Sequence, residues 1–292
     1  MQDFESLSVF CENEDELGEC PLWHAKSDSL YWIDWCRNIL YRKKREGSSA
    51  EHIQLDRNIR AFAFCRSGDL LLNLNGGLSL LNWENGELHE VISLSLGEEE
   101  QNVNDAKCDA RGRFWFGTIS SSGKGRLLRF DPADKSLRTI REDIHTSNGI
   151  GWSADGEAFY YADSGKKIIW KCAYDLETGE LGPFEDFADF SSIDLGNPDG
   201  LAVDVEGCVW VAMWDGKCVL RISETGKILR CIDFPVMRPT SCAFGGEDLK
   251  TLYVTSAAVD LEPQPAEQVL RSGNVFSMKV SIPGVPVAEC AI

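Results

Sequence analysis

Short apolar runs separated by polar turns make up most of the chain, and apolar residues at helical spacing are almost absent. The runs are rich in Val, Leu, Ile, Phe, Trp and Tyr, and they are bounded by Gly, Asp, Asn and Ser. Short runs of these apolar residues are typical of β-strands, and the residues that bound them favour turns. The pattern therefore predicts an all-β protein.

One unit, consisting of an apolar segment, a polar turn and a second apolar segment, occurs six times along the chain. The second segments begin at Leu30, Leu70, Phe114, Phe159, Val209 and Leu252. Their spacing of about 40 to 50 residues is the length of one four-stranded propeller blade. We therefore expect residues 1–292 to form a single domain, a six-bladed β-propeller with four antiparallel strands in each blade. A β-sandwich is the structural alternative, but it would not require this period.

The two ends of the chain are expected to close the ring. A single blade exposes both faces of a small sheet, so a propeller gains stability only when neighbouring blades pack and the ring is complete. We expect an N-terminal strand near Leu7 to Cys11 to pair with the blade that contains the C-terminal segment GNVFSMKVSI.

Composition limits the class of protein. With 43% hydrophobic and 26% charged residues, the chain can bury a large core and is not of the disordered or fibrous type. No apolar run approaches the roughly 20 residues that span a bilayer, and the first residues lack the pattern of a signal peptide. The eleven cysteines are scattered and include no CxxC pair, which favours reduced thiols over a disulfide framework. These features predict a soluble, cytoplasmic protein.

The charge of the chain limits its partners. A formal net charge of −18 repels phosphate backbones and anionic lipid, because binding to them depends on Lys and Arg. We expect neither nucleic acid nor membrane as a partner. The oligomeric state has no signal in the sequence.

A polar residue enters the first apolar segment of each unit. Counting back ten or eleven positions from each second segment reaches Glu19, Arg60, Asn104, Asn148, Asp199 and either Ser241 or Cys242. Equivalent positions of a closed propeller lie at one end of the ring. If the first segment is the innermost strand, these side chains point toward the axis.

Four of these residues form a donor set for a hard cation. Glu19 and Asp199 supply carboxylate oxygens, Asn104 and Asn148 supply neutral amide oxygens, and no thiolate is offered. Oxygen ligands of this kind suit Ca²⁺, Mg²⁺ or Mn²⁺. A single Asn, Asp or Glu before a strand is more often a turn residue that bonds its own backbone. Four oxygen donors in one phase of the repeat favour a metal site.

Five segments match motifs of one protein family in chain order: LGECPLW, NDAKCDARGRFWFGT, SNGIGWSADGEAFYYADS, NPDGLAVDVEGCVWVAMWDG and PTSCAFGGEDLKTLYVTSA. They resemble the successive motifs of the senescence marker protein, regucalcin and gluconolactonase family, and the resemblance extends over nearly the whole chain. The family is a six-bladed β-propeller with one central divalent metal, and its enzymes hydrolyse sugar lactones. The resemblance implies this fold and this activity.

The resemblance also implies roles for individual residues. The matching Glu, Asn and Asp are Glu19, Asn148 and Asp199, which resemble the direct ligands of one divalent metal ion (Ca, Zn, Mg or Mn). Asn104 matches a residue that lies beside the metal and contacts substrate or a bound water. Asp199 is the expected general base, because it is a carboxylate at the metal that can take the proton of a water adding to the lactone carbonyl.

One motif departs from the family pattern. The family commonly writes NRPND, whereas this chain writes QNVND and so places Asn102 where an Arg would bind substrate oxygens. An amide can hydrogen-bond a hydroxyl, but it offers neither the charge nor the fork of a guanidinium. Arg60, in the same phase one unit earlier, is a candidate to restore that cation, with a structural surface Arg as the alternative. Ser120 opens the short loop where the family has a lid, and it is a further candidate for substrate contact beside the simpler reading of an ordinary hairpin.

Other functions remain open. The missing Arg leaves room for an aryl-lactone or organophosphate hydrolase, and a non-catalytic calcium-binding regulatory propeller is a third candidate. A Ser/His/Asp hydrolase is disfavoured because the chain has no GxSxG elbow and only four His. Zinc chemistry based on histidines is disfavoured because no HExxH motif occurs.

Overall fold

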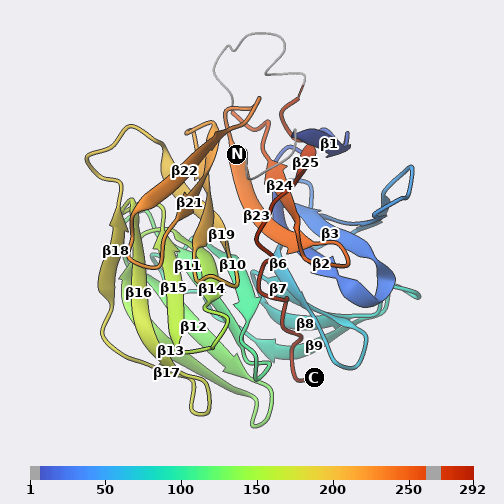
Figure 1. The fold of residues 1–292 in the computed structure, drawn as a ribbon. Helices are drawn as coiled ribbons and strands as arrows, with labels where there is room; N and C mark the ends of the chain where they lie inside the picture. The colour runs from blue at the N-terminus through green and yellow to red at the C-terminus, as the bar shows by residue number, and fades with distance from the viewer. Residues whose placement is uncertain (1–6, 261–270) are drawn as a thin grey trace.

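The computed structural model describes residues 7–260 and 271–292. It contains six antiparallel sheets arranged as the blades of a β-propeller, which confirms the predicted fold (Figure 1). Within these two ranges, the one helical segment is the 3₁₀ turn Ala25–Ser27. None of the helical structure in the described residues has the length and hydrophobicity needed to cross a membrane.

The blades follow one another along the chain. The first contains β2 (Gly18–His24), β3 (Ser29–Asp34), β4 (Ile39–Lys44) and β5 (Glu51–Gln54), and the second contains β6 (Ile59–Phe64), β7 (Leu70–Leu74), β8 (Gly77–Leu81) and β9 (Leu88–Ser93). The third contains β10 (Asn102–Cys108), β11 (Phe114–Ile119), β12 (Gly125–Asp131) and β13 (Ser136–Ile144). The fifth contains β19 (Asn197–Val203), β20 (Val209–Trp214), β21 (Cys218–Ile222) and β22 (Ile228–Asp233).

The fourth blade has a divided outer edge. Its inner strands are β14 (Ser147–Trp152), β15 (Ala158–Asp163) and β16 (Ile168–Asp175). One end of β16 pairs with β17 (Glu180–Leu181), and the rest pairs with β18 (Glu185–Asp189). The fourth strand position is therefore shared by two short strands.

The sixth blade closes the ring with both ends of the chain. It consists of β23 (Pro239–Gly245), β24 (Thr251–Ser256), β25 (Val275–Lys279) and the N-terminal strand β1 (Ser8–Cys11). Strand β1 pairs antiparallel with β25, Val9 lying opposite Phe276. The predicted closure is confirmed, because the two ends of the chain are paired within one blade.

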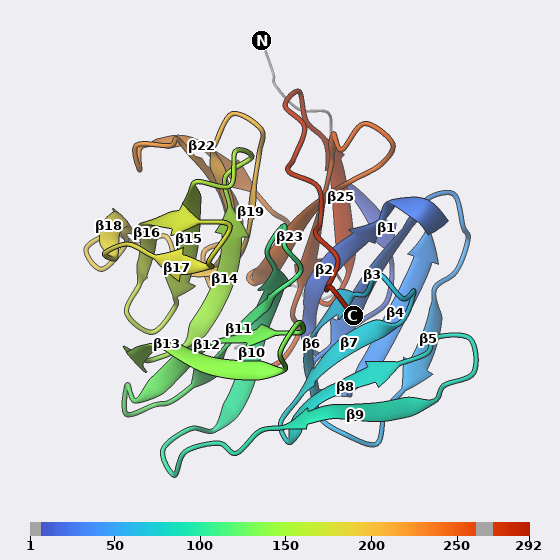
Figure 2. The same cartoon turned by 90° about the horizontal axis from the view of Figure 1, so that it is seen from below.

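The first strand of each unit is the innermost one. Each of β2, β6, β10, β14, β19 and β23 contacts the innermost strands of its two neighbours, which completes a ring around the axis. Apolar side chains of adjacent blades fill the spaces between sheets, with Trp32, Trp115, Phe62 and Phe116 among the fully buried ones. Residues 285–288 are among those that line a small cavity of about 160 Å³ at the C-terminal ends of these strands. The C-terminal segment crosses this end of the ring, with bridges from Gly284 to Asp204 and from Cys290 to Cys65 (Figure 2).

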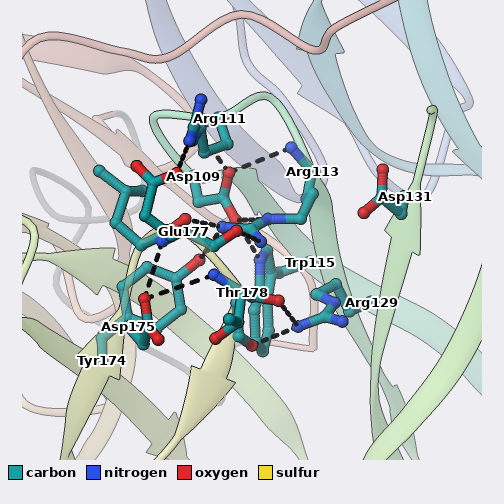
Figure 3. Close-up of polar contacts among 12 residues, drawn as sticks. Asp109, Arg111, Arg113, Trp115, Arg129, Asp131, Tyr174, Asp175, Glu177 and Thr178 are labelled. Carbon is teal, nitrogen blue, oxygen red and sulfur yellow. Dashed lines mark hydrogen bonds and ion pairs between the residues drawn. The ribbon is translucent and has the colours of Figure 1, made fainter.

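A buried carboxylate fastens the turn between the inner strands of the third blade. Asp109 Oδ2 accepts hydrogen bonds from Arg113 Nε at 2.7 Å, Trp115 Nε1 at 3.0 Å and Tyr174 Oη at 2.5 Å (Figure 3). Its Oδ1 accepts from the backbone N–H groups of Arg111 and Arg113. We call these residues, Asp109, Arg113, Trp115 and Tyr174, the Asp109 cluster. Because Tyr174 belongs to β16, the cluster joins the third blade to the fourth.

Candidate active site

All six innermost strands have a break in register near their N-terminal ends. The pairing with the second strand shifts between Glu19/Leu22, Ile59/Ala61, Val103/Ala106, Ser147/Ile150, Pro198/Leu201 and Pro239/Cys242. A β-bulge inserts extra residues that escape the alternation of a strand and aims their side chains in new directions. The extra residues include Asn104, Asn148 and Asp199, and Glu19 directly precedes its bulge.

A cavity of about 390 Å³ opens at this end of the ring. It is lined by Leu17, Glu19, Trp35, Asn104, Ile119, Thr146, Asn148, Ser164, Gly165, Asn197, Asp199 and Trp214. The volume lies in the range of roughly 300–1,000 Å³ that is usual for small-molecule sites. The four oxygen-bearing residues predicted to converge, Glu19, Asn104, Asn148 and Asp199, all line this cavity.

The two amides face the cavity with their oxygens because their nitrogens are engaged elsewhere. Asn104 Nδ2 donates to the carbonyl of Ser147 at 2.8 Å. Asn148 Nδ2 donates to Ser164 Oγ at 3.0 Å, and that hydroxyl donates to the carbonyl of Pro198 at 2.6 Å. Asn148 Oδ1 is buried without a hydrogen-bond partner. This oxygen is thus free to accept a ligand.

The two carboxylates are buried with too few donors. Asp199 Oδ1 has no hydrogen-bond partner, while Glu19 Oε2 accepts only from the adjacent backbone N–H of Cys20 at 3.0 Å. Burial, with repulsion from Asp105, raises the pKa of Glu19 to about 8. Burial, followed by repulsion from Glu19 and Asp105, raises the pKa of Asp199 well above its ordinary value. In this arrangement each negative charge disfavours the others.

Asp105 adds a third negative charge behind the cavity lining. Burial raises the pKa of Asp105, and Lys107 opposes that effect. Lys107 itself lies in the interior of the ring, where its Nζ donates to the carbonyl of Leu201 at 2.7 Å. No pattern in the sequence predicts a role for Asp105. It shares the bulge of β10 with Asn104, so both consecutive residues are directed inward.

A hard divalent cation fits this set of groups. A buried carboxylate without a partner is costly, and a cation that binds both acids and the free amide oxygen removes that cost. Cys20 offers no thiolate, because burial raises the pKa of its thiol and its Sγ donates to the carbonyl of Phe62. Within the described residues, no group of three or more His, Cys, Asp and Glu side chains is arranged to hold a metal. A site here depends on amide oxygens as well as on acids.

Glycines after two of the donors let the innermost strands approach closely. A Cβ on Gly149 would lie 2.5 Å from the carbonyl oxygen of Asp199, and one on Gly200 would lie 2.0 Å from Ser241 Oγ. Both distances are too short for a side chain. The sequences SNG and PDG therefore combine an oxygen donor with the residue that keeps the ring narrow.

Arg60 lies beside the cavity rather than in its lining. Its guanidinium carbon lies 3.5 Å from the ring centre of Trp35, and Nη1 donates to the Trp35 carbonyl at 2.7 Å and to Asn38 Oδ1 at 3.3 Å. Burial lowers the pKa of Arg60 to about 10. The guanidinium thus packs against Trp35, which lines the cavity.

Asn102 and Ser120 also lie outside the lining. Asn102 Oδ1 accepts from Asn75 Nδ2 at 2.7 Å, across the boundary between the second and third blades. Ser120 is buried, and its Oγ bonds Ser122 Oγ at 3.0 Å and the backbone N–H of Lys124 at 3.1 Å. The side chain of Asn102 therefore joins two blades, and that of Ser120 holds its own loop.

Several lining residues were missed by the sequence analysis. Trp35 directly follows β3, Ile119 and Trp214 end β11 and β20, and Ser164 directly follows β15. They share one signal, namely their position at the end of the second apolar segment. That position lies opposite the entrance to the innermost strand, as the pairs Asn102 with Ile119 and Asn197 with Trp214 show.

Comparisons with known proteins agree with this architecture. The family model described as "SMP-30/Gluconolactonase/LRE-like region" matches residues 17–258. The chain is 34% identical over 284 residues to 6-deoxy-6-sulfogluconolactonase of Pseudomonas putida, covering 96% of this chain and 97% of that protein.

Two solved structures are similar over nearly their whole length. A luciferin-regenerating enzyme superposes with a TM-score of 0.91 at 25% identity, covering 98% of this chain and 99% of its own. Regucalcin of Agrobacterium tumefaciens, described as a calcium-binding protein, superposes with a TM-score of 0.89 at 25% identity, covering 99% of this chain and 97% of its own.

Proposed function

Because the chain belongs to the SMP-30/gluconolactonase/LRE-like family, we propose that it is a metal-dependent lactonase that hydrolyses a sugar lactone to the hydroxy acid. This reaction is that of a carboxylic-ester hydrolase. The Pseudomonas putida relative is named for the hydrolysis of such a lactone, which supports the reaction type.

One observation supports the metal dependence most strongly. Asn148 Oδ1 and Asp199 Oδ1 are buried in the same cavity without hydrogen-bond partners, beside a second buried acid, Glu19. These three side chains would hold the ion, and Ca²⁺, Mg²⁺, Mn²⁺ and Zn²⁺ are the candidates. The description of the Agrobacterium tumefaciens regucalcin as calcium-binding supports a divalent cation. Such an ion, when bound, supplies Lewis-acid polarisation of the lactone carbonyl.

Asp199 is proposed as the general base. A water adds to the carbonyl carbon, and the carboxylate of Asp199 takes its proton as the new C–O bond forms. The ring C–O bond then breaks, and the same proton is delivered to the ring oxygen, which leaves as a hydroxyl group. Asn104, whose amide nitrogen is fixed on the carbonyl of Ser147, presents its Oδ1 to the cavity and orients this water or a substrate hydroxyl.

We place this reaction in the cytoplasm. All eleven cysteines are free in the structure, which supports a reducing compartment. The substrate is a small molecule, in keeping with the size of the cavity.

A calcium-binding regulatory role is the second candidate, favoured by the description of the regucalcin structure. The test is a pH-drop assay of metal-reconstituted protein with a panel of aldonolactones, aryl lactones and phosphotriesters. We expect acid release from the aldonolactones only, and its loss when the metal is chelated. Turnover confined to aryl lactones or phosphotriesters would replace the proposed substrate. No turnover of any substrate with any of the four metals would favour the binding role.

A further inference from the structure

The wall of the central cavity is apolar and aromatic, in contrast to its oxygen donors. Leu17, Trp35, Ile119 and Trp214 come from the first, third and fifth blades. Indole rings present flat apolar faces, which suit the C–H face of a sugar ring or a hydrophobic substituent. The cavity therefore combines a polar reaction centre with a surface for stacking.

The part of the chain that the structure describes places no positively charged side chain in the lining of this cavity. Within residues 7–260 and 271–292, no Lys, Arg or His belongs to the lining. The remaining parts of the chain, MQDFES and LEPQPAEQVL, contain no Lys, Arg or His. The chain thus offers no cationic side chain there from any segment.

An arginine stacks on each of the two tryptophans, and neither arginine lines the cavity. Arg238 lies with its guanidinium carbon 4.5 Å from the ring centre of Trp214, and it is fixed by Asp215 Oδ1 at 2.6 Å and by the carbonyl of Val259. Arg60 stacks on Trp35 in the same way, with its guanidinium carbon 3.5 Å from the ring centre. Arg238 is engaged by a carboxylate and a backbone carbonyl. Arg60 is engaged through Nη1 by backbone carbonyls and Asn38 Oδ1, and its buried Nε has no hydrogen-bond partner. Neither guanidinium belongs to the cavity lining.

Other basic groups near this end are engaged as well. Lys166 Nζ donates to the carbonyl of Asp143. His145 Nδ1 shares a hydrogen bond of 2.9 Å with Thr146 Oγ1. A phosphate, sulfonate or carboxylate on a substrate would consequently meet Glu19 and Asp199 without a side-chain counter-charge. Unpaired burial of such an anion is strongly unfavourable.

We infer that this cavity selects neutral lactones and excludes those with an anionic substituent, with Trp35 and Trp214 as its specificity-determining residues. The inference rests on the proposed lactonase function and narrows its substrate class. A metal ion at Glu19, Asn148 and Asp199 leaves it unchanged, because two carboxylates balance a divalent charge.

The first experiment compares matched lactones. Metal-reconstituted protein is assayed with an aldonolactone and with the same lactone carrying a 6-phosphate or a 6-sulfonate; the sulfonate is included because the Pseudomonas putida relative is named for it. We expect kcat/KM to be lower by at least about 10²-fold for both anionic lactones. Values within about threefold of the neutral lactone would overturn the inference.

Calorimetric titration with the same three lactones separates this inference from the proposed function. If no lactone is hydrolysed, the proposed function fails, but the heats of binding still decide the specificity. Preferential binding of the neutral lactone supports the inference. Equal or tighter binding of an anionic lactone contradicts it.

Two sets of variants assign the effect to residues. Asn197 lines the cavity and is partly exposed, so Asn197→Lys adds a cation without removing a tryptophan. It should raise the anionic-to-neutral ratio of kcat/KM by at least about tenfold, whereas the matched control Asn197→Gln should not. An unchanged ratio in Asn197→Lys would argue against charge as the cause.

The tryptophans are tested by Trp35→Leu and Trp214→Leu. Loss of a stacking face should raise KM for the neutral lactone roughly 2- to 10-fold with kcat nearly unchanged. Circular dichroism checks that each variant is folded. A folded variant with an unchanged KM would remove that tryptophan from the specificity site.

Discussion

Two buried carboxylates of the same ring, Asp109 and Asp199, are treated in opposite ways. Asp109 Oδ2 accepts three side-chain hydrogen bonds, and Oδ1 accepts two more from the backbone (Figure 3). Asp199 Oδ1 has no hydrogen-bond partner. Burial and repulsion from Glu19 and Asp105 raise the pKa of the Asp199 carboxyl, and they outweigh the hydrogen bonds from the Gly200 backbone and the Asn148 side chain, which lower it. Both aspartates belong to the inner part of a blade, and both are nearly inaccessible to water.

The difference shows how a structural acid is distinguished from a functional one. Buried polar groups are normally satisfied within the chain, so the Asp109 cluster needs nothing from outside. An acid that the fold buries and leaves unpaired requires an external partner. In this protein the acid with an unpaired oxygen, Asp199, lies in the central cavity.

Arginines in and beside the Asp109 cluster also hold the turn between β16 and β17. Arg113 Nη2 donates to the carbonyl of Leu176, and Arg129 Nη1 donates to the carbonyls of Thr178 and Gly179. Two arginines of the third blade thereby hold the turn between β16 and β17 of the fourth (Figure 3). The cluster is a joint between blades, whereas the central site is a place for a ligand.

The largest expected effect follows from breaking the satisfied acid. Asp109→Ala leaves Arg113, Trp115 and Tyr174 without their shared acceptor, so the free energy of unfolding should fall by about 3–5 kcal/mol. Urea denaturation measures this change. Asp109→Asn, which keeps one acceptor oxygen, is the matched control and should lose less. A loss below about 1 kcal/mol in Asp109→Ala would show that the cluster contributes little.

The unsatisfied acid should respond in the opposite sense. Asp199→Asn should lower kcat at least about 10²-fold, yet stabilise the metal-free protein, because it removes an acid whose ionised form is disfavoured by burial and by repulsion from Glu19 and Asp105. Initial rates and thermal denaturation with a chelator measure the two effects. Asp194→Asn, the same change at an exposed position, should alter neither. Retained activity in Asp199→Asn would remove its role as base.

A smaller effect links cation binding to pH. In the metal-free protein the pKa of Glu19 is raised to about 8. The contribution of Glu19 to the free energy of unfolding is therefore fully present at a pH below the ordinary pKa of a Glu side chain, and it is lost as the pH rises through about 8. A divalent cation replaces the proton, so the rise in Tm on adding Ca²⁺ or Mn²⁺ should grow from about pH 5 to about pH 8.

At about 100 times the Kd, the full gain is about 2.7 kcal/mol. Glu19→Gln is the control, in which most of the pH dependence of this gain should disappear. A gain of the same size at both pH values in the unaltered protein would contradict the linkage.

The period of the sequence was enough to predict the fold. The predicted starts of the second segments fall within one residue of the observed strands, for example Leu70 at the start of β7 and Leu252 one residue into β24. The period works because each blade repeats the same two inner strands and turn. That residues 1–292 form one domain stays a prediction.

The site was predictable only in part, because bulges break strand alternation. Alternation would place Asn104 and Asp105 on opposite faces, but the bulge in β10 directs both inward. Counting from the repeat also gave Glu19 and Asp199 the same phase, whereas Glu19 lies one residue before its bulge and Asp199 lies within its own. Bulges have no sequence signal as clear as the period of the blades.

The cavity wall escaped prediction for a different reason. Trp35 and Trp214 are large apolar residues in the same segments as core residues such as Trp32 and Met213. Residue type and sequence position alone do not distinguish the two groups. Only the place where each strand ends separates a wall residue from a core residue. Strand ends are set by pairing across the blade, which a single sequence does not specify.

Anomalous diffraction from crystals of the protein soaked with Mn²⁺ tests the proposed cation site most directly. We expect one strong peak in the cavity, within bonding distance of Glu19, Asn148 and Asp199. A map without a peak there, or with a peak only at other surface acids, would contradict it.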